Sequence, residues 1–281
     1  MKRFLFCGLL FCALTSYGQD TTKPPIYGWK HGIVAGLTLT QVAFTDWAQG
    51  GENALAYTVS ADGKSAADEE VTNWTNAYKL AFGQTRIGGQ GLRKTDDIID
   101  LATVFTYKPW TYVNPYVAAT MKTQFAKGLA YDGSGNETGV SQFFDPAYLT
   151  QSGGLGYQPI PGVKTRLGVA VREVVTSQFN QYTNDPSTPE IEKTTVDGGF
   201  ESVTNIEWSL AENMLFKTQL ELFDPLKHLD EVVVRNTTTI TAKVNKYIST
   251  IFSLQLVNEK RVSPKTQVKE SIAIGLSYTL F

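Results

Sequence analysis

Apolar and polar residues alternate along much of the chain with a period of two, which is the pattern of a β-strand with one apolar face. The segment 163–175 shows it clearly, since Val169 and Val171 fall on one face while Arg166 and Arg172 fall on the other. The same alternation recurs in 196–210, 214–222, 232–244 and the last residues of the chain. The pattern therefore predicts an all-β fold built from long strands.

Twelve segments of this kind follow one another, an even number, as single-chain bacterial barrels require. We expect strands at 32–44, 53–61, 74–86, 97–107, 110–125, 147–157, 163–175, 196–210, 214–222, 232–244, 247–257 and a last strand that ends the chain. They exceed the roughly five to six residues usual in globular proteins. They also reach the roughly 9 to 11 residues that a tilted crossing of a membrane needs.

The connections between these segments alternate in length. Short links are expected at 108–109, 211–213 and 245–246, and long polar loops at 126–146, 179–195, 224–231 and 258–266. Outer-membrane barrels have this asymmetry, with short periplasmic turns and longer extracellular loops. The link at 62–73 is an exception, because it is long where a short turn is expected. The pattern predicts a transmembrane antiparallel up-and-down β-barrel over residues 32–281, and it disfavours a soluble β-sandwich.

Aromatic residues gather at the ends of the expected strands, at the two levels where a membrane meets water. With the N-terminus on the periplasmic side, one level carries Trp74, Tyr107, Trp110, Tyr157, Trp208 and Tyr247, and the other carries Phe44, Phe125, Phe179 and Phe223. This arrangement favours a barrel in a lipid bilayer.

The first residues have the pattern of a secretory signal peptide. Lys2 and Arg3 supply positive charge, an apolar run follows, and small residues precede a cleavage site between Gly18 and Gln19. The apolar run is shorter than the roughly 20 residues of a transmembrane helix. We therefore expect residues 1–18 to be removed on export to the outer membrane.

The expected mature chain contains no cysteine, because Cys7 and Cys12 both lie in the segment that is removed. Loss of the signal peptide also changes the formal net charge from −2 to about −4. This mild acidity argues against a nucleic-acid partner, which calls for a basic patch. Residues 19–31 would form a short periplasmic segment before the barrel. We expect no cofactor.

Phe281 ends the chain on an amphipathic strand, and this resembles the signal by which the barrel-assembly machinery recognises its clients. Such signals commonly place another aromatic residue two positions earlier, where this chain has Thr279. The expected partners are therefore this machinery during biogenesis, and outer-membrane lipids afterwards.

Several segments, among them "FTDWAQGGEN" at 44–53 and "LRKTDDIIDLATVFTYK" at 92–108, resemble a family of Bacteroidota outer-membrane proteins catalogued as a domain of unknown function. The most specific parts are the run 94–97 and a cluster made of Trp47, Gly50, Gly51 and Asn53. The resemblance implies an outer-membrane barrel. It implies no activity, substrate or catalytic residue.

Candidate chemistry outside the barrel wall is sparse. Only His31 and His228 are histidines, and no serine stands beside either in the pattern of an outer-membrane lipid hydrolase. His31 is expected before the first strand. Asp96, Asp97 and Asp100 could form a calcium site, although a polar loop with one lumenal acid explains them better. Gly50 and Gly51 could let their loop fold tightly on the barrel, or simply form a surface turn.

The charged residues of the strands are the more informative set. Placing the apolar faces in lipid puts these residues in the lumen: Asp100, Lys164, Arg166, Arg172, Glu201, Glu207, Lys217, Glu221, Arg235, Lys243 and Lys269. The opposite assignment would cost roughly 2–4 kcal/mol for each Lys or Arg at the bilayer midplane. These charges either line a water-filled path or neutralise one another in a filled interior.

Three functions fit these observations. The preferred one is a non-enzymatic outer-membrane barrel that acts as a narrow passive pore for small polar solutes or ions, with selectivity set by lumenal charge. The second is a structural or accessory barrel that binds partners through its long loops. The third, a lipid-modifying enzyme, is disfavoured because no Ser–His arrangement is apparent.

Overall fold

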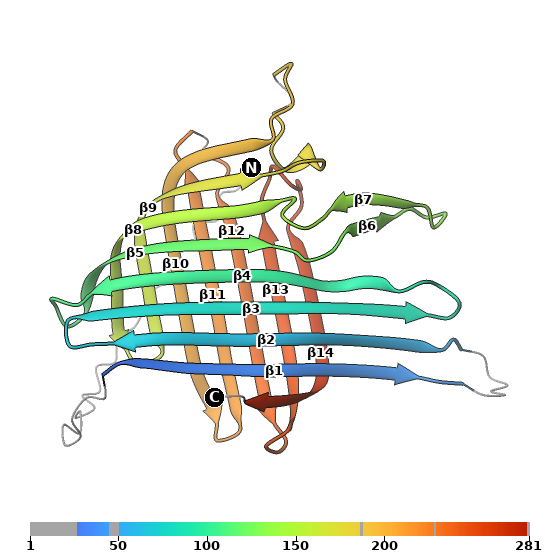
Figure 1. The fold of residues 1–281 in the computed structure, drawn as a ribbon, viewed down its shortest axis with the longest axis horizontal. Helices are drawn as coiled ribbons and strands as arrows, with labels where there is room; N and C mark the ends of the chain where they lie inside the picture. The colour runs from blue at the N-terminus through green and yellow to red at the C-terminus, as the bar shows by residue number, and fades with distance from the viewer. Residues whose placement is uncertain (1–26, 45–50, 186–187, 228, 280–281) are drawn as a thin grey trace, which may run out of the picture.

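The computed structural model describes residues 27–44, 51–185, 188–227 and 229–279. Twelve antiparallel strands form one closed barrel, in which each strand pairs with the barrel strands before and after it in the chain and β1 pairs with β14 (Figure 1). The barrel strands are β1 (Trp29–Val42), β2 (Ala54–Asp68), β3 (Thr72–Ile87), β4 (Arg93–Tyr107), β5 (Val113–Thr123), β8 (Ala147–Ile160), β9 (Val163–Val175), β10 (Thr194–Ala211), β11 (Met214–Pro225), β12 (Val233–Lys243), β13 (Ile248–Asn258) and β14 (Gln267–Thr279). β5 therefore pairs with β8, and β6 (Gly128–Tyr131) and β7 (Glu137–Ser141) form a separate hairpin. The expected closed barrel of twelve strands is confirmed.

One end of the barrel carries short turns, at 69–71, 108–112, 161–162, 212–213 and 244–247. The turn at 69–71 corrects the sequence-based prediction, because β2 continues to Asp68 and leaves no long link at 62–73. This part of β2 has small residues on either side of Asp62 and Lys64 where a strand would show large apolar ones, so the apolar alternation that predicts a strand is absent there. The described barrel therefore has short turns at this end without exception.

The opposite end carries the longer connections. The connection 124–146 includes the long polar loop expected at 126–146, and it contains the hairpin of β6 and β7 that projects beyond the barrel (Figure 1). The segment 176–193 contains the 3₁₀ helix η1 (Asn180–Tyr182). Within the described residues, no helix is long and apolar enough to cross a membrane.

The outer wall of the barrel is apolar and exposed. Val169 on β9 is 63% exposed and Ile272 on β14 is 76% exposed, although both lie in the middle of their strands. On β9, Ala170 and Arg172 have the opposite parity to Val169, face inward and are buried. Because side chains alternate between the faces of a strand, this exposure identifies the apolar face as the outer surface.

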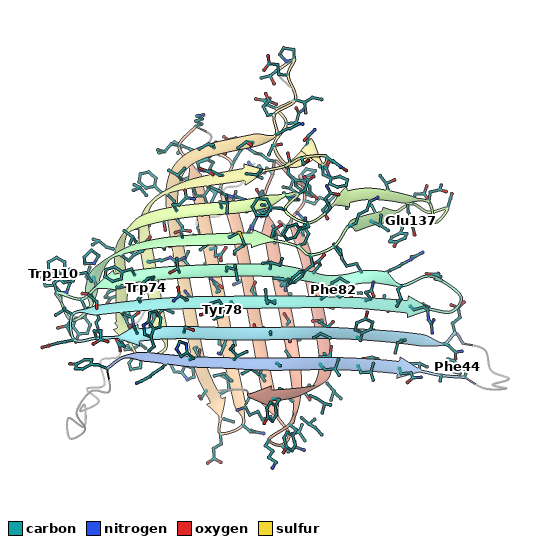
Figure 2. All side chains as sticks on the ribbon, in the orientation of Figure 1. Phe44, Trp74, Tyr78, Phe82, Trp110 and Glu137 are labelled. Carbon is teal, nitrogen blue, oxygen red and sulfur yellow. The ribbon has the colours of Figure 1, made fainter. Side chains whose placement is uncertain are left out.

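Aromatic residues mark the turn end of the outer wall. Six of those predicted there are exposed: Trp74, Tyr107, Trp110, Tyr157, Trp208 and Tyr247. Figure 2 places Trp74 and Trp110 at this end and Phe44 at the other. The prediction that Phe223 lies at the opposite membrane–water level is wrong, because its ring is buried in the lumen beside Arg172. It shares the inward parity of Glu221, and a position at a strand end does not reveal on which face a ring lies.

Glycines allow two strands to approach closely on one side of the barrel. A Cβ on Gly168 of β9 would lie 2.3 Å from the carbonyl oxygen of Gly153 and 2.8 Å from the Tyr116 hydroxyl. A Cβ on Gly154 would meet the Leu167 carbonyl at 2.2 Å. The Tyr116 ring can fill this part of the lumen because the wall behind it has no side chains.

Candidate functional site

The inward-facing side chains divide the lumen into two parts. At the turn end, Lys217 and Glu207 form an ion pair of 3.1 Å, and their side chains are 53% and 59% exposed. Lys164 and Lys243, also predicted to be lumenal, are exposed at the same end. We call this water-accessible part the vestibule.

The vestibule carries more positive than negative charge. Besides the four residues above, β2 and β3 contribute Asp62, Lys64 and Lys79 to its wall, and Asp62 lies directly opposite Lys79 in the strand register. The lysines in the described wall outnumber the acids. The electrostatic field of the vestibule therefore favours anions over cations.

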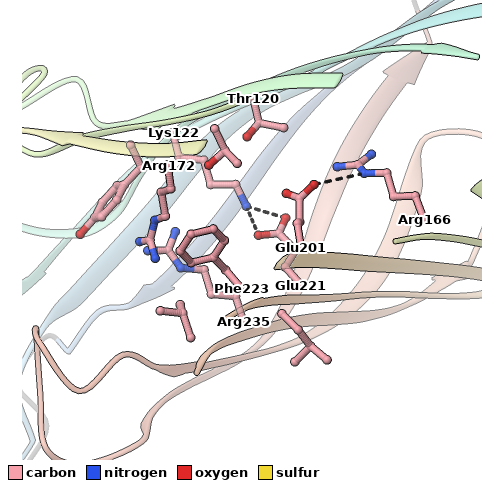
Figure 3. Close-up of a pocket in the computed structure, with 12 residues that line it drawn as sticks. Thr120, Lys122, Arg166, Arg172, Glu201, Glu221, Phe223 and Arg235 are labelled. Atoms are coloured by element: carbon pink, nitrogen blue, oxygen red, sulfur yellow. Dashed lines mark hydrogen bonds and ion pairs between the residues drawn. The ribbon is translucent and has the colours of Figure 1, made fainter. Parts of the chain in front are cut away.

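Beyond the vestibule, ion pairs join opposite walls of the barrel. Lys122 of β5 binds both carboxylate oxygens of Glu221 of β11 at 2.6 Å, although three strands separate β5 from β11 in the barrel order (Figure 3). Asp100 lies 3.6 Å from the same ammonium group. A contact between strands so far apart must cross the lumen. We call this region the constriction.

Two more of the predicted lumenal residues meet in the constriction. Arg166 Nε lies 3.8 Å from Glu201 Oε2 (Figure 3), and neither buried atom has a hydrogen-bond partner. The cavity that these residues share with Lys122, Arg172 and Arg235 has a volume of about 40 Å³. Such a volume holds only a few water molecules, so the side chains leave little free space at this point of the lumen.

At the loop end, the chain folds back into the mouth of the barrel. Glu259 follows β13 directly, and its two carboxylate oxygens bind Arg172 at 2.8 Å and Arg235 at 2.7 Å. Arg261 reaches Asp197 of β10 at 2.6 Å and Glu231 at 3.2 Å. The loop 259–266 therefore lies over the mouth, a position that its sequence does not indicate.

Burial alone would raise the pKa of the Glu259 carboxyl, but the adjacent guanidinium groups of Arg172 and Arg235 hold that pKa below its ordinary value of 4.5. The carboxylate is therefore ionised at neutral pH. Its exposed fraction is only 6%.

Lys269, the remaining predicted lumenal residue, binds Asp96 of β4 across the lumen, and its ammonium also donates to the Thr95 carbonyl oxygen at 2.9 Å. The three aspartates weighed as a calcium site thus have separate partners. Asp97 binds Lys94 at 2.8 Å and accepts hydrogen bonds from the backbone amides of Phe125 and Ala126. Within the described ranges, no group of His, Asp, Glu or Cys side chains is arranged for a metal ion.

The predicted set of lumenal residues omitted several that the structure places there: Asp62, Lys64, Lys79, Lys122, Asp197, Glu259 and Arg261. Lys122 could have been found, because it has inward parity in a segment already predicted as a strand. Asp197 likewise lies at an inward position of β10. Glu259 and Arg261 belong to a loop, where no periodicity shows which way a side chain points.

Two residues of the Trp47, Gly50, Gly51 and Asn53 cluster, Trp47 and Gly50, lie outside the described residues. His228 and Phe281 also lie outside them. Gly51 has a φ of +131°, and a Cβ there would lie 2.6 Å from the Phe44 ring. The Asn53 side chain accepts a hydrogen bond from the Phe44 amide at 2.6 Å. Glycine at 51 thus lets the chain close tightly over Phe44.

His31 lies within β1, not before it as predicted, and its Nδ1 is 2.9 Å from Ser65 Oγ. The expectation that no Ser–His contact exists is therefore wrong, because strand register joined two residues distant in sequence. The Tyr78 hydroxyl also donates to Ser65 Oγ at 2.5 Å, and Ser65 is only 9% exposed. These residues have the outward parity of Trp29 and Trp74, and the serine oxygen is covered by its two partners on that face.

Fold and lumen together define the class of protein: a closed twelve-stranded antiparallel β-barrel with an apolar outer wall and an interior crossed by ion pairs. Two family models match parts of the chain. Residues 39–129 match "Protein of unknown function (DUF3078)" and residues 147–280 match "Protein of unknown function, DUF481". Neither description names an activity. No match was found among curated proteins.

Among solved structures, the chain is similar to the translocator domain of the autotransporter NalP from Neisseria meningitidis, with 10% identity over 92% of this chain and 90% of that one and a TM-score of 0.39. It is similar to the NanC porin, with 8% identity over 88% and 98% and a TM-score of 0.39. An outer membrane channel from Pseudomonas putida F1 gives 9% identity over 94% and 99% and a TM-score of 0.40. Because these TM-scores are low, the assignment of the fold is based on the strand pairing of this chain.

Proposed function

We propose that this chain is a non-enzymatic outer-membrane barrel that conducts small ions, with a preference for anions, through a lumen closed at one end by ion pairs. The outer wall supports the location. Large apolar side chains in mid-strand, such as Val169 and Ile272, are exposed around a sheet that has no free edge. A closed barrel satisfies every backbone hydrogen bond without water, which is the requirement for crossing lipid.

The graded exposure of the inward-facing residues is the observation that carries the channel proposal. Lys217 and Glu207 are half-exposed in the vestibule, whereas Arg172 and Glu259 at the mouth are buried. A scaffold without a transport role has no need for a wet, charged vestibule leading to one closed point. A channel closed by side chains and one loop has this arrangement.

Conductance in planar lipid bilayers tests the proposal. The full-length protein should give small, reproducible current steps in potassium chloride, with the anion more permeant than the cation. Glu221→Gln removes an acid from the constriction and should increase the permeability ratio of chloride to potassium, because Lys122 loses its counter-charge. Ile272→Val on the outer wall is the matched control and should leave the ratio unchanged.

Absence of current from the wild type and from a variant in which residues 260–264 are replaced by a short glycine linker would contradict the proposal. That outcome would favour the alternative of an accessory barrel that binds partners through the long segments 124–146 and 176–193.

A further inference from the structure

The carboxylate of Glu259 occupies a clamp made by two arginines of the barrel wall. Arg172 on β9 and Arg235 on β12 each bind one of its oxygens. Both arginines belong to paired strands, whereas Glu259 lies outside the strands, at the start of the loop 259–266. The clamp is therefore a fixed element, and its anion is carried by a segment that the sheet does not hold.

The two arginines of the clamp have further contacts besides those with Glu259. The Tyr148 ring lies 5.1 Å from the Arg172 guanidinium carbon and 4.6 Å from that of Arg235, so it supports both groups. The Phe223 ring lies 5.7 Å from the guanidinium carbon of Arg172. Arg235 Nε is buried without a hydrogen-bond partner, so a donor remains free for another acceptor.

The clamp also adjoins the cavity of the constriction. Arg172 and Arg235 line that cavity together with Lys122 and Arg166. Of the acids in the same lining, Glu221 is bound to Lys122 and Glu201 lies next to Arg166. Asp100 also lies 3.6 Å from Lys122. Glu259 is therefore the only one of these acids that forms ion pairs with Arg172 and Arg235 in the described residues.

Buried cations keep the loop in place. If Glu259 left the clamp alone, two guanidinium groups would remain buried without a counter-ion, which is strongly unfavourable. The other anchors of the loop are the ion pairs of Arg261 with Asp197 and Glu231, and the hydrogen bond of Lys260 to the Asp230 carbonyl oxygen. Glu259 can leave when another anion of the same shape takes its place.

We propose that Arg172 and Arg235 form a binding site for the carboxylate group of a small organic solute, and that such a solute opens the mouth by displacing Glu259. The opening step rests on the proposed channel function; the binding site does not. A carboxylate fits because the planar group of Glu259 already makes one hydrogen bond to each guanidinium.

The binding site is tested by complementation with acetate. In full-length Glu259→Ala the clamp is empty. In Glu259→Gln, used if the alanine variant does not assemble, the clamp has lost its counter-ion. The readout is the fraction of barrel that remains folded on a denaturant or heating series, scored by heat-modifiable gel migration. At about ten times its dissociation constant, acetate should raise the folded-to-unfolded ratio about tenfold. Chloride at the same ionic strength should not.

The control variant carries Arg172→Gln and Arg235→Gln in addition to Glu259→Gln. It has no clamp and should not respond to acetate. Equal effects of acetate and chloride on the single variant, or an undiminished acetate effect in the control, would overturn the site.

The displacement is tested on the wild type, which needs no variant to fold. Replacing chloride by gluconate on the loop side should increase the open probability of the channel, and the clamp-free variant should show no such increase. An unchanged open probability in the wild type would overturn displacement by solute. If neither the wild type nor Glu259→Gln carries current in any anion, the channel proposal fails, and the acetate experiment still decides the site.

Discussion

Placing an arginine on the outer wall tests which face of the barrel meets lipid. Val169 is 63% exposed at the centre of β9, with its side chain on the apolar face. Val196 on β10 faces outward as well and is 51% exposed, but it pairs with Glu173, whereas Val169 pairs with Phe200. The two valines are thus about four positions apart along the wall, or roughly 10 Å in depth for tilted strands.

The two substitutions are expected to differ in their effect on stability, because the free energy of placing a cation in lipid depends on its depth in the bilayer. Val169→Arg should destabilise the barrel by roughly 2–4 kcal/mol, the value for the midplane, and Val196→Arg by about 0–1 kcal/mol, the value near an interface. With a factor of ten for each 1.4 kcal/mol, the first change lowers the folded-to-unfolded ratio by roughly 30-fold to several hundredfold.

Equilibrium unfolding by urea in lipid vesicles, followed by tryptophan fluorescence and gel migration, measures both variants. Val169→Ala controls for the loss of side-chain volume. Equal destabilisation by arginine at 169 and at 196 would refute the depth argument. A Val169→Arg variant as stable as Val169→Ala would refute the assignment of this face to lipid.

Three further predictions follow from the geometry. A peptide tag inserted after Gly133, at the tip of the β6–β7 hairpin, should be accessible to antibody on intact cells, and one after Asn245 should not; the reverse result would invert the barrel. Because the pKa of Glu259 lies below its ordinary value of 4.5, the stabilisation from its ionised form is complete above about pH 4.5 and is lost as the pH falls through the lowered pKa. Bilayer conductance should therefore rise only on acidification below about pH 4.5, and Glu259→Gln should abolish this dependence; a rise already at pH 6 would contradict it. Gly168→Ala should destabilise the barrel by about 1–3 kcal/mol through overpacking, whereas Gly198→Ala, with nothing within 4 Å of the added Cβ, should change the unfolding midpoint little; similar midpoints for the two would argue against the close strand approach.

The class of fold could be predicted from sequence because a strand has a strictly local signature. Alternation with a period of two gives the face of each residue from its immediate neighbours, and β9 was predicted with its observed bounds, Val163–Val175. The same local rule gives the inward parity of Arg166 and Arg172. Where small residues interrupted the alternation, as in the second half of β2, the rule gave a strand that was too short.

The partners across the lumen could not be predicted in this way. Lys122 meets Glu221, and Lys269 meets Asp96, only because the barrel closes with one particular register and tilt. The contact between His31 and Ser65 has the same origin.

The sequence by itself determined the number of strands, their faces and the presence of charge in the lumen, since each depends on residues adjacent in the chain. Only the tertiary structure showed that a loop carboxylate enters the mouth of the barrel. That result depends on Glu259 reaching Arg172 on β9, far along the chain and four strands away around the wall. A loop side chain finds such a partner because the closed barrel brings the two together, and no local pattern records the distance across the lumen.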